Sequence, residues 1–416
     1  MLITRRHLLK SSMALVPVVA FLPTVLQRAA VTSLLESTTG TPENDRTLII
    51  VQMAGGNDGL NTVVPYTDER YYDYRLEVAI PQEEVIPLNE EVGFHPSLTE
   101  FKSLWDDGVL VIVEGVGYPS QSYSHFQSMD IWRTADPEGA LRKGWLGRYF
   151  ETLNQSQEGA FQGMAVGKVL PLELSSPNVS IPIVSSLAAY QLQGDPAYPA
   201  TTRARIESLL NLYAESPAEM PYTALLDNTL EVAYQSAQAL QQADQAYQAA
   251  VEYPNTPLAK GLRLLAEAII GDLGVRVGHV ITGGFDTHAD QKETHSQLLK
   301  ILAEGLYAFY QDLKAHDRDK NVVVMTWSEF GRRVKSNASN GTDHGSAGPL
   351  FFIGTKVGGG LYGQRPDLGD LDKDNLRFTT DFRTVYATVL EKWLGASTEV
   401  VLGDNRFGEL PIFSQE

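Results

Sequence analysis

A β-branched apolar run followed by acidic and histidine side chains constrains the fold of this chain more than any other feature. Residues 322–325 are apolar, with charged residues shortly before them and Glu329 shortly after, which predicts a buried parallel strand. A polar loop then carries Asp343 and His344, and a second apolar run, 349–353, returns the chain to the sheet. Because ligands of open α/β sheets bind beyond the carboxyl ends of strands, we expect chemistry around Glu329 and His344.

Three more apolar runs predict strands that also end in polar residues. They are 46–53, which is followed by Asn57 and Asp58; 109–113, which leads to Ser124 and His125; and 275–281, which is followed by Asp286 and His288. Repeated strand, loop and helix units predict an α/β fold with a mainly parallel, doubly wound sheet flanked by helices. Short strand-like runs in 160–200 predict peripheral strands, and helical spacing over about 201–273 predicts a helical insertion.

Charge and cysteine content exclude several classes of site. The 416 residues carry a formal net charge of −18, with a pI near 4.9, and 43% of them are hydrophobic. A nucleic-acid partner is not expected, because a phosphate-binding face needs clustered Lys and Arg. The sequence contains no cysteine. Disulfides and thiolate ligands are therefore excluded, and His, Asp and Glu are left as the possible metal ligands.

Residues 1–30 predict an export signal outside the fold. Arg5 and Arg6 precede a mostly apolar stretch that ends near small residues, which is typical of a twin-arginine signal peptide. The alternative is an N-terminal membrane anchor, although the stretch is short for a span. Cleavage removes four basic groups and no acids, so the net charge changes from −18 to −22. We expect a linker at 31–46, a domain at 47–416, and a location in the periplasm or at the cell surface, without a stable membrane span after cleavage.

The polar groups at the four strand ends predict a metal site. The candidate ligands are Asn57, Asp58, His125, Asp286, His288, Glu329, Asp343 and His344. Oxygen and imidazole ligands of this kind suit Zn²⁺, Mn²⁺, Mg²⁺ or Ca²⁺. Two ions roughly 3.5–4 Å apart would need such a set from separate loops. We therefore expect one or two divalent ions at this edge of the sheet.

The candidate ligands also have structural interpretations. Asp286 and His288 lie two residues apart, so both can face one ion from an extended segment, whereas the alternative is that Asp286 caps the following helix. Asp343 and His344 can equally occupy a surface turn. Glu329 directly follows a buried strand and is poorly solvated, so it needs a partner, which is either a metal or a nearby arginine.

Ser124 and Arg332 are the candidate catalytic residues. A serine at a helix start can act as a nucleophile, because the helix N-terminus stabilises an alkoxide and holds an anion, but serine is also a common N-cap. Arg332 or Arg333 is expected to steady a substrate anion, and Arg332 is also the arginine that could pair with Glu329. A triad of Ser124 and His125 is disfavoured, because adjacent side chains diverge and no Gly-x-Ser-x-Gly elbow is present.

Eight segments resemble an exported bacterial family, domain of unknown function 1501. They are MAGGNDGLNTVVPY, GFHPSL, VEGVGYPSQSYSHFQSMDIW, GWLGRY, GGFDTHADQ, MTWSEFGRRV, GTDHGSAGP and DFRTVYATVLEKWLG. The resemblance covers nearly all of the chain after the signal. It implies an alkaline phosphatase-like and sulfatase-like fold, whose members hydrolyse phosphate or sulfate esters at one or two metal ions.

The resemblance also implies roles for individual residues. Asp58 or Asn57 would match the acidic ligand that ends the first strand, and Ser124 would match the nucleophile. Asp286 and His288 would match a ligand pair. Glu329 would match a carboxylate that ends another strand, and His344 would match the histidine of the last site loop. The chain departs from the superfamily pattern in having Ser328 and Glu329 where an Asp-His pair is usual, and His125 next to the serine.

These features lead to two hypotheses. The first is an exported, metal-dependent hydrolase that acts on a small anionic phosphate or sulfate ester. The alternative is a non-catalytic surface protein of the same fold that binds a surface glycan or a co-exported partner. Metal content and activity on a panel of esters distinguish them.

The export hypothesis makes a direct prediction. Replacing both Arg5 and Arg6 by Lys keeps the charge but should leave the precursor in the cytoplasm, because the arginine pair is read by a receptor. Cell fractionation measures this. Export of the double-Lys protein at the parent level would refute the assignment.

Overall fold

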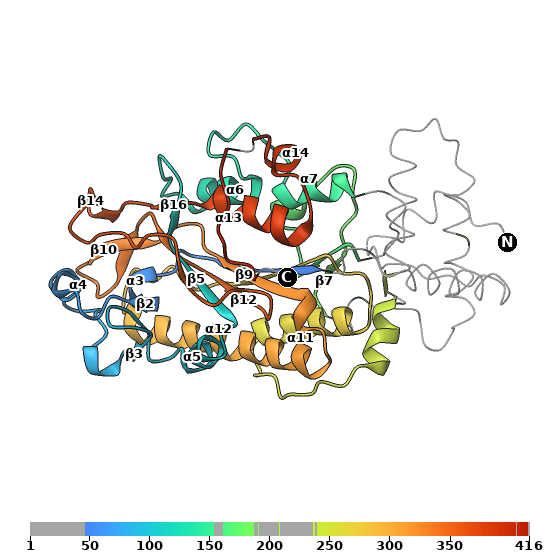
Figure 1. Ribbon diagram of the computed structural model, residues 1–416, viewed down its shortest axis with the longest axis horizontal. Coiled ribbons are helices and arrows are strands. Elements are labelled where there is room, and N and C mark those ends of the chain that lie inside the picture. The colour runs from blue at the N-terminus through green and yellow to red at the C-terminus, as the bar shows by residue number, and fades with distance from the viewer. Residues whose placement is uncertain are drawn as a thin grey trace, which may run out of the picture.

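The structure is a computed structural model that describes residues 46–153, 161–186, 190, 208, 236–237, 239–404 and 406–414. In this part of the chain, one large sheet separates two layers of helices (Figure 1). The predicted α/β fold, with a largely parallel sheet and helices on both faces, is confirmed. No helix in the described ranges is both long and apolar enough to cross a membrane.

The main sheet contains the four strands predicted from apolar runs. Its strands are β1 (Thr47–Met53), β5 (Leu110–Gly117), β6 (Gly163–Val166), β7 (Ile183–Val184), β8 (Val277–Thr282), β9 (Val322–Trp327), β12 (Gly348–Ile353), β13 (Gly360–Tyr362) and β16 (Thr380–Asp381). Shorter strands outside it are β2 (Val63–Val64), β3 (Ile86–Pro87), β4 (Gly93–Phe94), β10 (Arg332–Ser336), β11 (Thr342–His344), β14 (Leu371–Asp372) and β15 (Asn375–Leu376).

The order of the strands brings the polar strand ends together. It is β13-β5-β12-β9-β1-β8-β6-β7, and β16 also pairs with β5. β1 is parallel to both β8 and β9, whereas β12 is antiparallel to β5 and β9. β12 runs backwards because the chain returns from β9 through the β10-β11 hairpin without a crossover helix. The carboxyl ends of β1, β5, β8 and β9 therefore share one edge with the start of β12.

Helices cover both faces of the sheet (Figure 1). One layer contains α5 (Thr99–Asp106), α11 (Pro257–Ile270) and α12 (Gln291–Ala315), and the other contains α6 (His125–Thr134), α7 (Trp145–Thr152), α13 (Phe382–Thr388), the π-helix η4 (Val389–Leu394) and α14 (Thr398–Leu402). The remaining helical segments are α3 (Gly59–Thr62), α4 (Glu69–Tyr74), η1 (Gln82–Glu84), η2 (Leu172–Leu174) and η3 (Asp319–Asn321). Side chains of β1 alternate between the layers: Ile49 and Val51 belong to one core cluster, Leu48 and Ile50 to the other.

Some of the predicted segments lie outside the described residues. These are the signal at 1–30, nearly all of the linker at 31–46, and most of the helical insertion at 201–273. Within the described part of that insertion, residues 239–246 are helical and α11 follows. The peripheral strands predicted in 160–200 occur as β6 and β7, at one end of the sheet.

A buried ion pair fixes the loop after β1. Arg75 donates to both carboxylate oxygens of Asp58, at 2.6 and 2.9 Å, and both side chains are buried. Arg75 also donates to the carbonyl of Arg333 at 3.0 Å, and Gln291 of α12 donates to Asp58. Burial alone would raise the pKa of Asp58, but Arg75 outweighs it and the pKa is lowered. The pair thus ties this loop to α4, α12 and β10.

Removing Arg75 should destabilise the fold strongly. Arg75→Met leaves the Asp58 carboxylate buried and uncompensated, so the free energy of unfolding should fall by about 3–5 kcal/mol. Urea denaturation measures this. Arg377→Met, which breaks the exposed pair with Asp370, is the matched control and should change stability little. Equal effects of the two substitutions would show that the buried pair does not hold the loop.

Candidate metal centre

Polar side chains from three parts of the chain meet at the carboxyl edge of the sheet. Asp286 and His288 follow β8, His344 ends β11, and His125 begins α6 after the loop that leaves β5. Parallel pairing of β8 and β9 with β1 brings these loops to the same edge. One group that could hold a metal ion consists of His125, Asp286 and His344, whose ligand atoms all lie within 4.8 Å of one another.

The Nε2 atoms of three histidines surround the Asp286 carboxylate. Asp286 Oδ1 lies 3.0 Å from the Nε2 atoms of both His288 and His344, and Oδ2 lies 3.3 Å from His125 Nε2. His288 Nε2 and His344 Nε2 are 2.9 Å apart. Two ligands each about 2.0 Å from a tetrahedral ion are about 3.3 Å apart, so the spacing is close to that of a metal-bound set.

The Nδ1 atoms of the same histidines all face acceptors. His125 Nδ1 lies 2.8 Å from Glu329 Oε1, and His344 Nδ1 lies 2.8 Å from the carbonyl oxygen of Tyr123. His288 Nδ1 lies 3.3 Å from Asp343 Oδ1. Because carboxylate and carbonyl oxygens accept, Nδ1 is the nitrogen that carries the hydrogen when each ring has only one, and Nε2 then has a lone pair. Partners of this kind orient metal-binding histidines.

This arrangement of lone pairs fits a bound cation. Two neutral Nε2 atoms at 2.9 Å repel each other, and both also face the anionic Asp286. A proton or a metal ion between them removes the repulsion. Three imidazoles and one carboxylate are ligands that zinc and similar transition metals favour, whereas Mg²⁺ and Ca²⁺ prefer oxygen atoms alone. The residues present therefore fit a divalent ion of the zinc type.

Arg332 positions Asp286 instead of facing a substrate. It is buried, and its Nη2 donates to Asp286 Oδ1 at 2.7 Å. Its other acceptors are the backbone carbonyl oxygens of Gly55, Gly56, Phe285 and Thr342. Partial burial raises the pKa of Asp286, whereas the hydrogen bond from the Arg332 guanidinium lowers it, and the pKa of Asp286 is about 2. We expected Arg332 to steady a substrate anion, but these bonds engage its guanidinium within the protein.

Glu329 lies behind His125. Its buried Oε1 accepts the Gly55 backbone N–H at 2.9 Å and faces His125 Nδ1. The partner of this carboxylate is therefore a histidine, not Arg332, and Glu329 supports a ligand of the candidate site. Asp343 has the same relation to His288 and also accepts from Asn337, at 3.2 Å. Glu329 and Asp343 were both predicted to be metal ligands, and in the structure each of them contacts and orients a histidine of the candidate site.

Asn57 and Asp58 belong to a separate buried network. Both oxygens of Asp58 accept from Arg75, and Asn57 Oδ1 lies 3.0 Å from His295 Nε2. The side-chain amide of Asn57 donates to Thr62. The oxygen atoms of these two predicted ligands therefore face partners other than His125, His288 and His344.

Ser124 occupies the N-cap position of α6 but makes no side-chain capping bond. It is exposed and directly precedes His125. The backbone N–H of Ser124 instead donates to the Ser122 hydroxyl, at 3.3 Å. The Ser124 hydroxyl is therefore not used for capping, which leaves the predicted role as nucleophile open.

Three features of the site escaped the sequence analysis. The Tyr123 carbonyl holds His344, and the Phe330 ring lies 5.0 Å from that of His125 and 4.5 Å from that of His344. Gly55 has φ near 125°, and a Cβ there would lie 2.4 Å from the Asp286 nitrogen. The glycine therefore admits a neighbouring backbone. Only Phe330, next to Glu329, could have been noticed from its position in the sequence.

Comparisons with known proteins place the chain in a family. No curated protein matches it. Among solved structures, it is similar to the lipoteichoic acid synthase LtaP from Listeria monocytogenes, with 9% identity, a TM-score of 0.35, and 84% of this chain and 80% of that chain covered. A sulfatase from Pseudoalteromonas sp. shows 10% identity, a TM-score of 0.34, and coverage of 84% and 70%. A family model described as protein of unknown function, DUF1501, matches residues 111–403, and the chain belongs to this family.

Proposed function

We propose that the protein is an exported, metal-dependent hydrolase of a phosphate or sulfate ester. The observation that carries the proposal is the convergence of three Nε2 atoms on Asp286, with every Nδ1 facing an acceptor. Such a constellation leaves few roles other than binding a cation. The ester class rests on what the family resemblance implies, a fold like that of phosphatases and sulfatases, and export rests on the twin-arginine pattern.

The proposed site holds one ion of the zinc type. His125, His288, His344 and Asp286 would bind it, while Glu329, Asp343 and the Tyr123 carbonyl would hold the imidazoles in place. A bound divalent ion supplies Lewis-acid chemistry, polarising an ester oxygen and lowering the pKa of the attacking group. A second ion at Asn57 and Asp58 gains no support, since Arg75 neutralises that carboxylate.

Two residues are proposed for attack on the ester and for binding of the substrate anion. The exposed Ser124 hydroxyl, at the N-terminus of α6 and next to His125, is the proposed nucleophile. Arg333 is exposed, and its charge helps to lower the pKa of Asp343, so it lies near the site. Arg333 therefore replaces Arg332 as the residue proposed to steady the substrate anion. A triad using His125 as base is not favoured, since both ring nitrogens face carboxylates.

The second candidate function is binding without catalysis. The three histidines and Asp286 would hold a structural ion equally well, and Ser124 would then be an ordinary exposed residue. In this case, the protein binds a glycan or a co-exported partner. Metal content alone does not distinguish the candidates, but ester hydrolysis does.

His288→Ala should remove bound metal and ester cleavage while leaving the fold largely intact. Loss of a direct ligand should lower metal affinity by more than the roughly 10–100-fold expected for Asp343→Asn, which only loosens the support of His288. Elemental analysis and metal titration of the purified proteins measure this. His316→Ala, at the end of α12, is the matched control and should bind metal like the parent.

The outcome that opposes this proposal is specific. If His288→Ala retains as much metal as the parent and equals it on every ester tested, the metal-dependent hydrolase is refuted. If His288→Ala loses metal but the parent cleaves no phosphate or sulfate ester, the binding protein is favoured.

Ser124→Ala tests the nucleophile. A covalent route through the hydroxyl should lose activity on the order of 1,000-fold or more, with metal content unchanged. Steady-state hydrolysis of the best ester measures this, and Ser103→Ala, an exposed serine of α5, is the control. A loss of less than about tenfold would exclude Ser124 as the nucleophile, because attack by water does not need the hydroxyl.

A further inference from the structure

A pocket of about 620 Å³ lies at the same edge of the sheet as the candidate metal centre and is lined by none of the candidate metal ligands. It lies between the end of β5, the start of β12 and α3, where Glu114, Pro349 and Leu60 contribute to its wall. The volume is in the range of small-molecule sites, roughly 300–1,000 Å³. Its apolar lining residues are Leu60, Val63, Pro65, Pro349, Pro366, Leu368 and Leu376.

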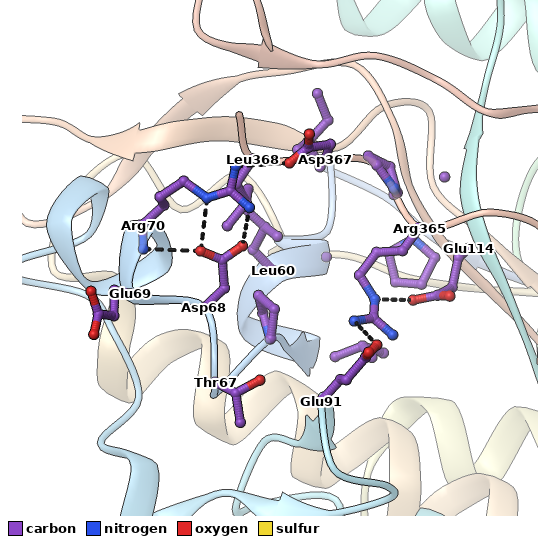
Figure 2. Close-up of a pocket in the computed structure, with 18 residues that line it drawn as sticks. Leu60, Thr67, Asp68, Glu69, Arg70, Glu91, Glu114, Arg365, Asp367 and Leu368 are labelled. Atoms are coloured by element: carbon purple, nitrogen blue, oxygen red, sulfur yellow. Dashed lines mark hydrogen bonds and ion pairs between the residues drawn. The ribbon is translucent and has the colours of Figure 1, made fainter. Parts of the chain in front are cut away.

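Two charged clusters flank this apolar surface (Figure 2). The Arg70 cluster consists of Asp68, Glu69, Arg70 and Asp367, and the Arg365 cluster consists of Glu91, Glu114 and Arg365. Figure 2 shows Leu60 between them. With five carboxylates and two guanidinium groups, the lining has a formal charge of −3, and each cluster is negative by itself.

The two arginines are already engaged with carboxylates. Arg70 donates to Asp68 through Nε and Nη2, at 2.9 and 2.8 Å, and to Asp367 through Nη1, at 2.9 Å. Arg365 donates to Glu114 at 2.9 Å and to Glu91 at 3.1 Å. An anionic ligand would have to break these charge-assisted bonds and approach a surplus of negative charge. The pocket is therefore unsuited to the phosphate or sulfate group of the proposed substrate.

The surplus carboxylates suit a cation. Glu114, on β5, is only 8% exposed, so its charge has little water to stabilise it. Arg365 supplies one partner and is shared with Glu91. At the other cluster, the Gly369 backbone N–H and Arg70 lower the pKa of Asp367, which keeps it ionised. An ammonium group at each cluster would change the formal charge of the lining from −3 to −1, and a hydrocarbon chain between them would cover the apolar surface.

We propose that this pocket binds a small aliphatic diamine or oligoamine, with one ammonium group at each charged cluster. The site is independent of the proposed hydrolase function, because no metal ligand contributes to it. A sugar fits less well, since no aromatic side chain is among the described residues that line the pocket and could stack on a sugar ring.

Calorimetric titration of the full-length protein with 1,6-diaminohexane tests the proposal. We expect saturable binding with one ligand per chain, and binding about tenfold weaker for 1-aminohexane, which reaches only one cluster. Adipate, the corresponding dianion, should not bind. Binding of adipate in preference to the diamine would overturn the proposal.

Charge-removing variants locate the site. Glu91→Gln and Asp367→Asn keep an oxygen that accepts from Arg365 or Arg70 but remove one charge each, and each should weaken diamine binding about tenfold. Glu84→Gln removes an exposed charge outside the pocket and should leave binding unchanged. If Glu84→Gln weakens binding as much as the pocket variants, or if no variant has an effect, only general attraction to an acidic protein is present and the proposal is refuted.

Discussion

The buried guanidinium of Arg332 is the interaction on which the carboxyl edge of the sheet depends. It donates to the backbone carbonyls of Gly55 and Gly56 after β1, of Phe285 after β8, and of Thr342 in β11. A buried cation must find such acceptors, because its desolvation is costly. The same group also holds Asp286, around which three imidazoles gather. One side chain thus joins three loops and fixes the carboxylate at the centre of the candidate site.

The sequence predicted the parts of the fold that depend on local patterns. Apolar runs marked β1, β5, β8 and β9, and because parallel strands share a carboxyl edge, the polar residues after them could be expected to meet. The i and i+2 spacing of Asp286 and His288 likewise predicted that both face one point. His125 was found as a neighbour of Ser124, at the start of a predicted helix. The family resemblance rested on the same segments and is confirmed.

The rest depended on contacts between distant residues, which no local pattern reveals. Asp58 was predicted to be a metal ligand because it follows a strand. Its partner is instead Arg75, 17 residues later, and only the packing of the folded chain brings this arginine to the carboxylate. Glu329 was expected to be buried, yet only the structure shows that it faces Nδ1 of His125 and not Nε2. His344 contacts the backbone carbonyl oxygen of Tyr123. Every residue has such an oxygen, so the side chain at position 123 could not predict this contact.

The balance of charge at the candidate metal centre suits a divalent ion. Asp286, Glu329 and Asp343 are three carboxylates, Arg332 is the one guanidinium bound to them, and the imidazoles are neutral when Nδ1 carries the hydrogen. The formal charge of this group is therefore −2, which one divalent ion neutralises. The Nε2 atoms of His288 and His344 are only 2.9 Å apart, so one cation between the two neutral rings removes their repulsion. A single ion between the rings satisfies both the charge and the geometry.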